Sequence, residues 1–279
     1  MTSIHKLTRN VSTSIRKRGN AIANEARIGA RHLFLLSPPL SGSTAITQLI
    51  KTSPNVSVFP GSGEGQFLPE VKNILFVDER WNPGLPIDWA RVRKIFFQYW
   101  SPLKPVRFEK SPPSIVRAID LERVFRNSSF LITLRNPYAQ IEGLLRRQWP
   151  FGEYGPQSSP SSPLTPKAAA EFWVKTAKYQ LHNIEHLGDT CFFTYEELTE
   201  RPGETAQRIT DFLPGLGVLD TGSKFTAHNI TGKPIKGFKN LNQQKIEKLT
   251  RQQIGEINQV LGRHEDLLER FQYQLLSNN

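Results

Sequence analysis

A loop of small, hydroxyl-bearing residues follows the first apolar run of the chain, in the segment HLFLLSPPLSGSTAITQLI at 32–50. Gly42 lets the backbone turn closely around a ligand, and the amides and hydroxyls of Ser41, Ser43 and Thr44 lie at the positive end of the helix that follows. This arrangement is typical of a phosphate cradle. A Walker A loop has glycine at position 37 and lysine at position 43, where this chain has serine in both places. A strand-to-helix turn capped by Ser and Thr is the structural alternative.

Charged residues follow two further apolar runs. Arg135 comes directly after FLITL and before a helix that Asn-Pro begins, and its planar guanidinium matches the geometry of a phosphate. Glu109, Lys110 and Ser111 follow the short run VRF, just before a helix that begins with proline. Because ligands of open parallel sheets bind beyond the carboxyl ends of the strands, these side chains are expected to converge on one pocket.

The elements that must position these residues alternate along the chain. Short β-branched or aromatic runs are separated by longer segments of helical period, which predicts an α/β fold with a mainly parallel sheet flanked by helices. We expect strands near 32–37, 56–59, 106–110, 129–134 and 191–195. We expect helices near 43–52, 88–100, 114–126, 137–148, 166–186, 202–213 and 243–273.

The α/β domain is expected over 31–279. Two segments of the chain do not follow the alternation, one before this domain and one inside it. Residues 1–30 form a basic amino-terminal arm that supplies much of the net charge of +11. The arm lacks interleaved aromatic residues, so we expect a solvated, partly helical tail and no nucleic-acid partner, with an organelle transit peptide as a second interpretation. The segment 150–166 holds five prolines among glycines and serines, which predicts a flexible loop that is either a lid or disordered.

Composition narrows the class of protein further. The hydrophobic fraction of 38% and charged fraction of 22% are those of a globular protein. A single cysteine, Cys191, allows neither an internal disulfide nor a zinc site built from cysteines. The apolar runs are far shorter than the roughly 20 residues that a membrane-spanning helix needs, and no secretory signal is evident, so we expect a cytoplasmic protein. The basic excess favours anionic partners without choosing among them.

Taken together, the motifs resemble those of the sulfotransferase family that uses 3′-phosphoadenosine 5′-phosphosulfate (PAPS) as sulfuryl donor. The likeness runs from about residue 31 to the carboxyl terminus. SPPLSGST is similar to the family's 5′-phosphosulfate loop, and LRNPYAQIEGLL is similar to its 3′-phosphate motif. EKSPP resembles a segment of glycan-type members, and GEGQFL resembles the element that carries their general base. FTYEELTERPGETAQRITDFL is similar to a widespread continuation of the fold, and HNITGKPIKGFKN is similar to a late basic loop over the nucleotide. The resemblance implies a fold like that of the P-loop nucleotide-binding proteins.

The resemblance also implies a reaction and a role for each matched residue. The sulfuryl group of PAPS, the co-substrate, is transferred by in-line displacement to a hydroxyl acceptor, expected on a carbohydrate or another glycan-like molecule, and no metal is required. Glu64 is the expected general base, and Lys110 is expected to neutralise charge on the transferring group. The expected ligands of the 5′-phosphate are Ser41, Gly42, Ser43 and Thr44, and those of the 3′-phosphate are Arg135 and, as a second candidate, Lys236.

Two positions depart from the family pattern. Leu40 stands where many members have a Lys or Arg that contacts the sulfuryl group, and Gly143 stands where most have a Ser that binds the 3′-phosphate. These departures leave open a degenerate protein that binds a nucleotide or a polyanion without catalysis; a nucleotide or sugar kinase is a further alternative. Tyr195 resembles an adenine-contacting position, but an aromatic residue on a buried strand is expected in the core.

Overall fold

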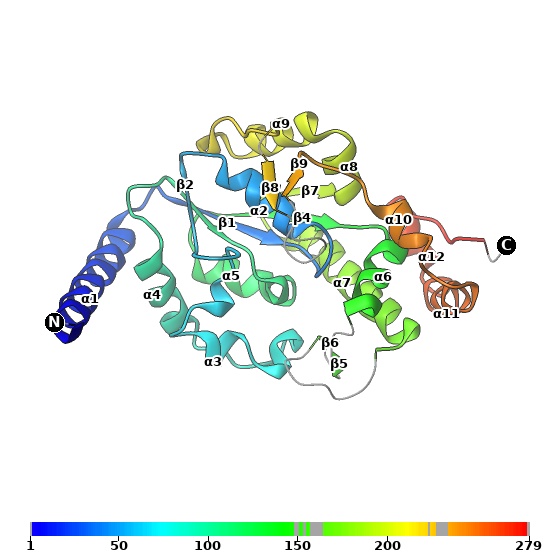
Figure 1. Ribbon diagram of the computed structural model, residues 1–279, viewed down its shortest axis with the longest axis horizontal. Helices are drawn as coiled ribbons and strands as arrows, with labels where there is room; N and C mark the ends of the chain where they lie inside the picture. The colour runs from blue at the N-terminus through cyan, green and yellow to red at the C-terminus, as the bar shows by residue number, and fades with distance from the viewer. Residues whose placement is uncertain are drawn as a thin grey trace.

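A computed structural model describes residues 2–147, 151–152, 155–156, 164–222, 224–226 and 234–277, with the side chains of 2–12, 151–152, 156, 224–226 and 234–236 excepted. Its centre is a parallel five-stranded sheet with the strand order β2-β3-β1-β4-β7 (Figure 1). The strands are β1 (Arg31–Leu36), β2 (Val56–Val58), β3 (Val106–Glu109), β4 (Ser128–Leu134) and β7 (Thr190–Thr194). The predicted α/β class and parallel sheet are confirmed, and each predicted strand lies within one residue of an observed one.

Helices cover both faces of the sheet, as the alternation of side chains along β1 requires. Leu33 and Leu35 point to a layer formed by the helices over 43–51, 195–200 and 202–212, whereas Phe34 and Leu36 point to a layer that contains the helices over 89–99, 118–124, 166–186 and 251–261. All four side chains are completely buried. A strand that is apolar on both faces is what a sheet covered on both sides needs.

Helices occupy the predicted segments 43–52, 88–100, 137–148, 166–186 and 202–213, whereas the helices over 72–75 and 195–200 were not predicted. The described helices are α1 (Thr2–Ala26), α2 (Ser43–Lys51), α3 (Lys72–Leu75), α4 (Trp89–Tyr99), α5 (Ala118–Val124), α6 (Pro137–Arg147), α7 (Pro166–His186), α8 (Tyr195–Glu200), α9 (Pro202–Phe212), α10 (Asn242–Ile246), α11 (Arg251–Leu261) and α12 (Glu265–Arg270), with short 3-10 turns η1 (Gly65–Phe67), η2 (Asp78–Trp81), η3 (Pro112–Arg117) and η4 (Pro214–Leu216). Two short antiparallel pairs, β5 (Phe151–Gly152) with β6 (Gly155–Pro156) and β8 (Lys224–Thr226) with β9 (Pro234–Lys236), complete the described elements.

The single helix predicted over 243–273 was wrong. Three short helices occupy this region, because Thr250 forms a capping box with Gln253 that starts α11 anew, and α11 ends at Gly262. The helix predicted over 114–126 likewise begins as the 3-10 turn η3, with Pro112 in its first turn, and becomes α-helical only from Ala118.

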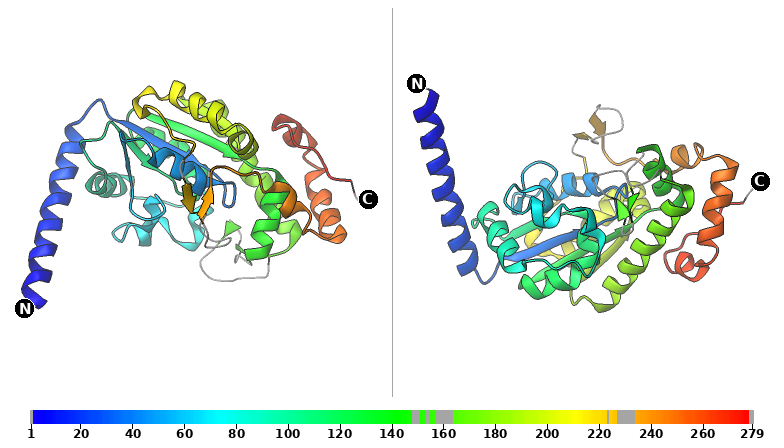
Figure 2. Two further views of the ribbon diagram at one scale, coloured as in Figure 1. Left: turned by 45° about the horizontal axis from the view of Figure 1, so that its top comes forward. Right: turned by 90° about the horizontal axis from the view of Figure 1, so that it is seen from below.

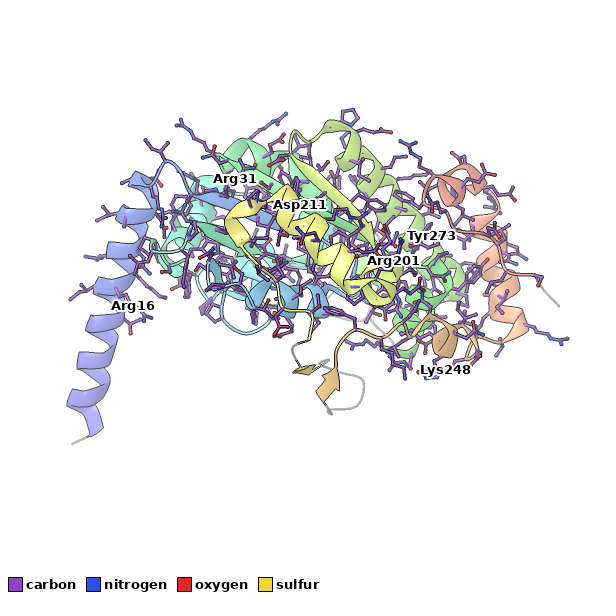
Figure 3. All side chains as sticks on the ribbon, turned by 90° about the horizontal axis from the view of Figure 1, so that it is seen from above. Arg16, Arg31, Arg201, Asp211, Lys248 and Tyr273 are labelled. Atoms are coloured by element: carbon purple, nitrogen blue, oxygen red, sulfur yellow. The ribbon has the colours of Figure 1, made fainter. Side chains whose placement is uncertain are left out.

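The two ends of the chain lie at opposite ends of the molecule (Figure 2). Helix α1 projects from the body, and its second half is tied to α4 by Asn24, whose amide donates to the carbonyls of Phe97 at 2.7 Å and Trp100 at 2.8 Å. Arg16 stands on this helix, exposed to solvent (Figure 3). Among the described residues, no helix is both long enough and apolar enough to cross a membrane. Most of the predicted loop at 150–166 lies outside the described residues.

Candidate active site

Three strands end at the same edge of the sheet, and each delivers one of the predicted site segments. The register pairs Phe34 of β1 with Glu109 of β3, and Leu36 of β1 with Ile132 of β4. The loop after β1, Lys110 after β3 and the residue after β4 therefore follow neighbouring strand ends. The three segments therefore lie at one edge of the sheet, and their meeting in one pocket stays a prediction.

The loop between β1 and α2 has the backbone of an anion cradle. Leu40 and Gly42 both adopt the left-handed conformation, with φ of 65° and 86°. A side chain at Gly42 would collide with the ring of Tyr195, whose Cδ2 lies 2.6 Å from the position of a Cβ. Ser41 is buried, and its hydroxyl donates to Oε1 of Gln140 on α6 at 3.0 Å. Glycine is thus required at position 42 both by conformation and by the close approach of an aromatic ring.

Arg135, the residue that follows β4, is held against this loop. Its side chain is 4% exposed; Nη1 donates to the carbonyl of Leu40 and Nε to Oδ1 of Asn242, both at 2.8 Å. The guanidinium also lies 3.9 Å from the ring centroid of Tyr195. Its remaining nitrogen, Nη2, is buried and has no hydrogen-bond partner among the described residues. A buried donor of this kind is costly unless a ligand satisfies it.

Asn242 is itself fixed by a second set of contacts. Glu196 at the start of α8 accepts a hydrogen bond from the Asn242 amide and, through its other oxygen, one from the hydroxyl of Tyr273 at 3.0 Å. Burial raises the pKa of Tyr273 well above its ordinary value, so this hydroxyl remains a donor. The carboxyl-terminal region therefore orients the guanidinium at the end of β4.

Lys245 on α10 is a cation of this site that the sequence did not reveal. It is buried, and its Nζ donates to Oε2 of Glu142 at 2.9 Å, while Arg146 contacts the other oxygen of that carboxylate at 3.1 Å. A Cβ at Gly143 would stand 2.8 Å from this Nζ and 2.9 Å from Cδ1 of Leu40. The space left by the missing side chain at Gly143 is thus filled by an ammonium group and by Leu40. Burial lowers the pKa of Lys245 to about 8.

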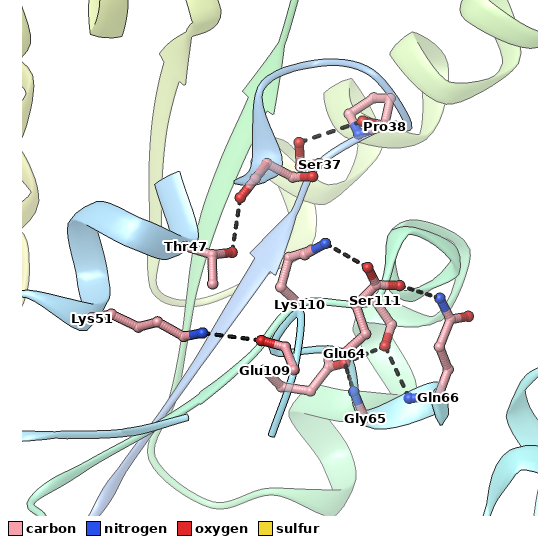
Figure 4. A network of polar contacts seen from close by, with 12 residues as sticks. Ser37, Pro38, Thr47, Lys51, Glu64, Gly65, Gln66, Glu109, Lys110 and Ser111 are labelled. Carbon is pink, nitrogen blue, oxygen red and sulfur yellow. Dashed lines mark hydrogen bonds and ion pairs between the residues drawn. The ribbon is translucent and has the colours of Figure 1, made fainter. Parts of the chain in front are cut away.

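The acidic and basic residues at the end of β3 form an ion pair. Nζ of Lys110 lies 2.6 Å from Oε1 of Glu64, and Oε2 of Glu64 accepts a hydrogen bond from the Gln66 amide at 2.5 Å (Figure 4). The Lys110 side chain is 4% exposed and the Glu64 side chain 12%. A carboxylate and an ammonium therefore face each other in a nearly closed site beside the anion cradle.

The loop that carries Glu64 also lies against the helix of the cradle. Gly63 has φ of 83°, and a Cβ there would approach Cγ2 of Thr47 on α2 and Cγ1 of Val58 to 3.2 Å. Its carbonyl accepts the backbone N–H of Lys110 at 3.1 Å. These contacts place the two predicted catalytic residues and the predicted phosphate loop around one site.

For two predicted residues, Lys236 and Tyr195, the structure gives a different outcome. Lys236 closes β9, but its side chain lies outside the described part of the structure. Tyr195 is buried as expected, at 6% exposure, but its placement on a strand was wrong: Thr194 caps a new helix through a capping box with Glu197, so Tyr195 begins α8. Its ring covers Gly42 and Arg135, and its hydroxyl donates to the carbonyl of Lys239 at 3.0 Å.

Comparison with known proteins identifies what this arrangement resembles. No family model matches the chain. A curated protein of Caenorhabditis briggsae named "Putative protein-tyrosine sulfotransferase" is 23% identical over 198 residues, which are 65% of this chain and 64% of that protein. The chain is thus similar in sequence to a sulfotransferase. The match thus spans slightly less than two thirds of the relative's length.

Solved sulfotransferase structures share the fold of this chain. A sulfotransferase domain from the curacin biosynthetic pathway has a TM-score of 0.50 and 16% identity, covering 90% of this chain and all of that one. The sulfotransferase domain of the Synechococcus PCC 7002 olefin synthase has a TM-score of 0.52 and 18% identity, covering 91% and 98%. The sulfotransferase STF9 of Mycobacterium avium has a TM-score of 0.53 and 12% identity, covering 96% and 83%. At these identities the likeness is one of fold.

Proposed function

We propose that this protein transfers a sulfuryl group from PAPS to a hydroxyl group of an acceptor. The observation that carries the proposal is the pairing of two features at one sheet edge. One is a buried arginine beside an anion cradle, with a donor that no described residue takes up, and the other is the Glu64–Lys110 ion pair at the neighbouring strand end. PAPS supplies an activated sulfuryl group and a phosphate leaving group.

The cradle fits the 5′ side of the donor. The amides and hydroxyls of Ser43 and Thr44 begin α2, where the helix dipole favours an anion, and Gly42 allows a close approach of the backbone. Ser41 remains a candidate on the basis of the resemblance, but its hydroxyl must release Gln140 to contact a ligand. The lysine of a Walker A loop is replaced by Ser43, which disfavours the kinase alternative.

Arg135 and Lys245 are the candidate ligands of the 3′-phosphate. Nη2 of Arg135 offers a charge-assisted hydrogen bond that no described residue takes up, and Lys245 adds a second buried positive charge at Gly143. Lys245 thereby compensates for the serine that this family usually has at position 143. Lys236 remains a further candidate on the basis of the resemblance.

Glu64 is the proposed general base, and it must release its partner to act. In the ion pair its Oε1 is engaged by Lys110. When Lys110 turns toward the sulfuryl oxygens or the leaving phosphate, Oε1 becomes free to accept the proton of the acceptor hydroxyl. The Leu40 side chain packs toward Gly143 and offers no positive charge to the sulfuryl group. Lys110 is the cation that can take over this contact. In-line displacement then requires chiefly the positioning of acceptor and donor.

The proposed acceptor is a hydroxyl group, and two kinds of hydroxyl compound are candidates. The resemblance of EKSPP to glycan-type enzymes favours a carbohydrate hydroxyl. The name of the Caenorhabditis briggsae relative favours the phenolic hydroxyl of peptide tyrosine. The departures from the family pattern at Leu40 and Gly143 support an alternative function, in which the protein binds a nucleotide or a polyanion without catalysis.

An acceptor screen tests the proposal. The protein is incubated with sulfur-labelled PAPS and sugars, lipids, simple phenols or tyrosine peptides, and both transferred label and released 3′-phosphoadenosine 5′-phosphate are counted. We expect label on one acceptor class, with equimolar release of the bisphosphate. Binding of the bisphosphate without transfer to any class would contradict catalysis and favour the degenerate binding protein.

A further inference from the structure

A third ionisable residue lies beneath the Glu64–Lys110 pair. Glu109, the last residue of β3, is 1% exposed. Its Oε1 accepts hydrogen bonds from the backbone N–H of Gly65, at 3.1 Å, and from the hydroxyl of Ser111, while its Oε2 accepts one from the hydroxyl of Ser114 at 3.3 Å. All three partners are donors, which is the set of contacts that an ionised carboxylate requires.

These contacts fix the backbone that carries the proposed base. Gly65 directly follows Glu64, and its N–H is bound by Glu109. The next N–H, that of Gln66, donates to the hydroxyl of Ser111 at 3.2 Å, and Glu109 orients this hydroxyl by accepting its proton. Two consecutive amides after Glu64 are therefore anchored to the end of β3 (Figure 4).

The side chains are linked in the same way. Gln66, whose backbone is anchored through Ser111, donates its own amide to Oε2 of Glu64. Lys110, which holds Oε1, is the next residue after Glu109. Glu109 itself is almost completely buried, and its contacts are to η1, Ser111 and η3.

We propose that Glu109 is a positioning residue that holds Glu64 and Lys110 in register for proton transfer, and that its ionised form is the working one. The inference rests on the proposed sulfotransfer and assigns a control of that same site. When Glu109 is protonated, the oxygen that carries the proton becomes a donor, so one of the hydroxyl contacts, such as that of Ser114, has to reverse its direction.

The surroundings of Glu109 bring its pKa into the pH range of an activity assay. Burial raises the pKa of Glu109 to about 7, the nearby Glu64 carboxylate raises it as well, and its three donors lower it. Lys110 directs its ammonium group to Glu64. Arg117 of η3 lines a small pocket together with Glu109, but its guanidinium donates to the carbonyls of Leu85 and Asn82.

Variants at position 109 separate positioning from bulk stability. In Glu109→Gln the amide oxygen still accepts from Gly65 and Ser111, and the amide nitrogen can donate to Ser114. In Glu109→Leu no acceptor remains. Asp211→Asn on the exposed surface of α9 is the matched loss of a carboxylate (Figure 3). The activity readouts are kcat, the KM for PAPS and their dependence on pH, measured with the acceptor found in the screen.

We expect the wild type to lose kcat as the pH falls through about 7, and Glu109→Gln to lack this step. Glu109→Leu should reduce kcat by about 10²-fold, the usual cost of a displacement near 1 Å, while the KM for PAPS stays close to that of the wild type. Asp211→Asn should keep the wild-type profile. A step near pH 7 that persists in Glu109→Gln, or a Glu109→Leu enzyme with wild-type kcat, would overturn the inference.

A measurement without turnover keeps this inference separate from the proposed function. Because the folded-state pKa of Glu109 is raised, its contribution to stability is present at low pH and is lost as the pH rises through about 7. The Tm of Glu109→Gln should therefore gain on that of the wild type between about pH 5 and pH 8. A constant difference would refute the ionisation of Glu109, whereas a rising difference in a protein that transfers no sulfuryl group would refute only the proposed reaction.

Discussion

The two halves of the site differ in how far their charges are already satisfied. At the end of β4, Arg135 is fixed by Leu40 and Asn242 and still presents a buried nitrogen without a described partner. At the end of β3, Glu64 and Lys110 satisfy each other at 2.6 Å. In the proposed mechanism, the half around Arg135, which binds the donor, is thus formed in advance for an anion, whereas the half around Glu64, which carries the base, must exchange an internal partner for a substrate. The donor should therefore bind without the acceptor, and the base should become free only when the donor is present.

Removing the proposed base should have the largest effect on turnover. It should leave binding at the half of the site around Arg135 unchanged. Glu64→Gln keeps the size of the side chain but cannot accept a proton, so we expect turnover to fall by about 10²–10⁴-fold. Binding of 3′-phosphoadenosine 5′-phosphate, measured by calorimetry, should be retained, because position 64 lies outside the proposed phosphate contacts. Wild-type turnover in this variant would remove Glu64 from the mechanism.

Arg135→Lys should affect the other half. Lysine keeps the positive charge but lacks the planar fork that reaches Leu40, Asn242 and a ligand together. Loss of one charge-assisted hydrogen bond costs about 1.5–3 kcal/mol, so the Kd for the bisphosphate should rise by about 10- to 10²-fold. Arg201→Lys, at an exposed i,i+3 ion pair, is the control (Figure 3). Equal affinities in the two variants would count against a phosphate at Arg135.

The close approach of the cradle to Tyr195 can be tested with two glycines of the same backbone type. Gly42 and Gly61 both have positive φ, but a Cβ at Gly61 meets nothing within 4 Å. Gly61→Ala should show only the backbone cost of about 1–2 kcal/mol. Gly42→Ala should lose a further 1–3 kcal/mol, roughly, through overpacking against the Tyr195 ring. Chemical denaturation gives both values, and equal losses would show that the ring yields without cost.

The smallest expected effect concerns pH on the donor half. The pKa of Lys245 is lowered to about 8 by burial, so its ammonium is charged below that pH and neutral above it. The affinity for the bisphosphate should therefore weaken as the pH rises through about 8, by about tenfold, which corresponds to roughly 1.4 kcal/mol. Lys245→Met, of similar length and always neutral, should bind weakly at neutral pH and lack this step. A step that survives in Lys245→Met would have to come from another group.

The sequence was most informative where the signal is local. Apolar runs define the strands of a sheet that is buried on both faces, and the residues directly after them, Ser41–Thr44, Lys110 and Arg135, are carried to one edge by parallel topology alone. For this reason the fold and the convergence of the site were predictable from motif positions.

The contacts that complete the site were not predictable, because they join residues far apart in the chain. Asn242 reaches Arg135 across 107 positions, and Lys245 reaches Glu142 across 103. A glycine at position 143 looks like a lost ligand until the structure shows an ammonium group in its place. Tyr195 was misplaced because the sequence pattern did not separate the end of β7 from the capping box that starts α8.

The central claim is a pocket for a doubly phosphorylated adenosine, and a thermal-shift comparison tests it most directly. Wild-type protein is melted with 3′-phosphoadenosine 5′-phosphate and, separately, with ATP plus Mg²⁺. At a ligand concentration of about 100 Kd, binding to the folded state adds about 2.7 kcal/mol, which corresponds to a rise in Tm of roughly 5–10 °C. We predict this rise with the bisphosphate, and a smaller rise in Arg135→Lys. A rise with ATP and Mg²⁺ alone would contradict the claim.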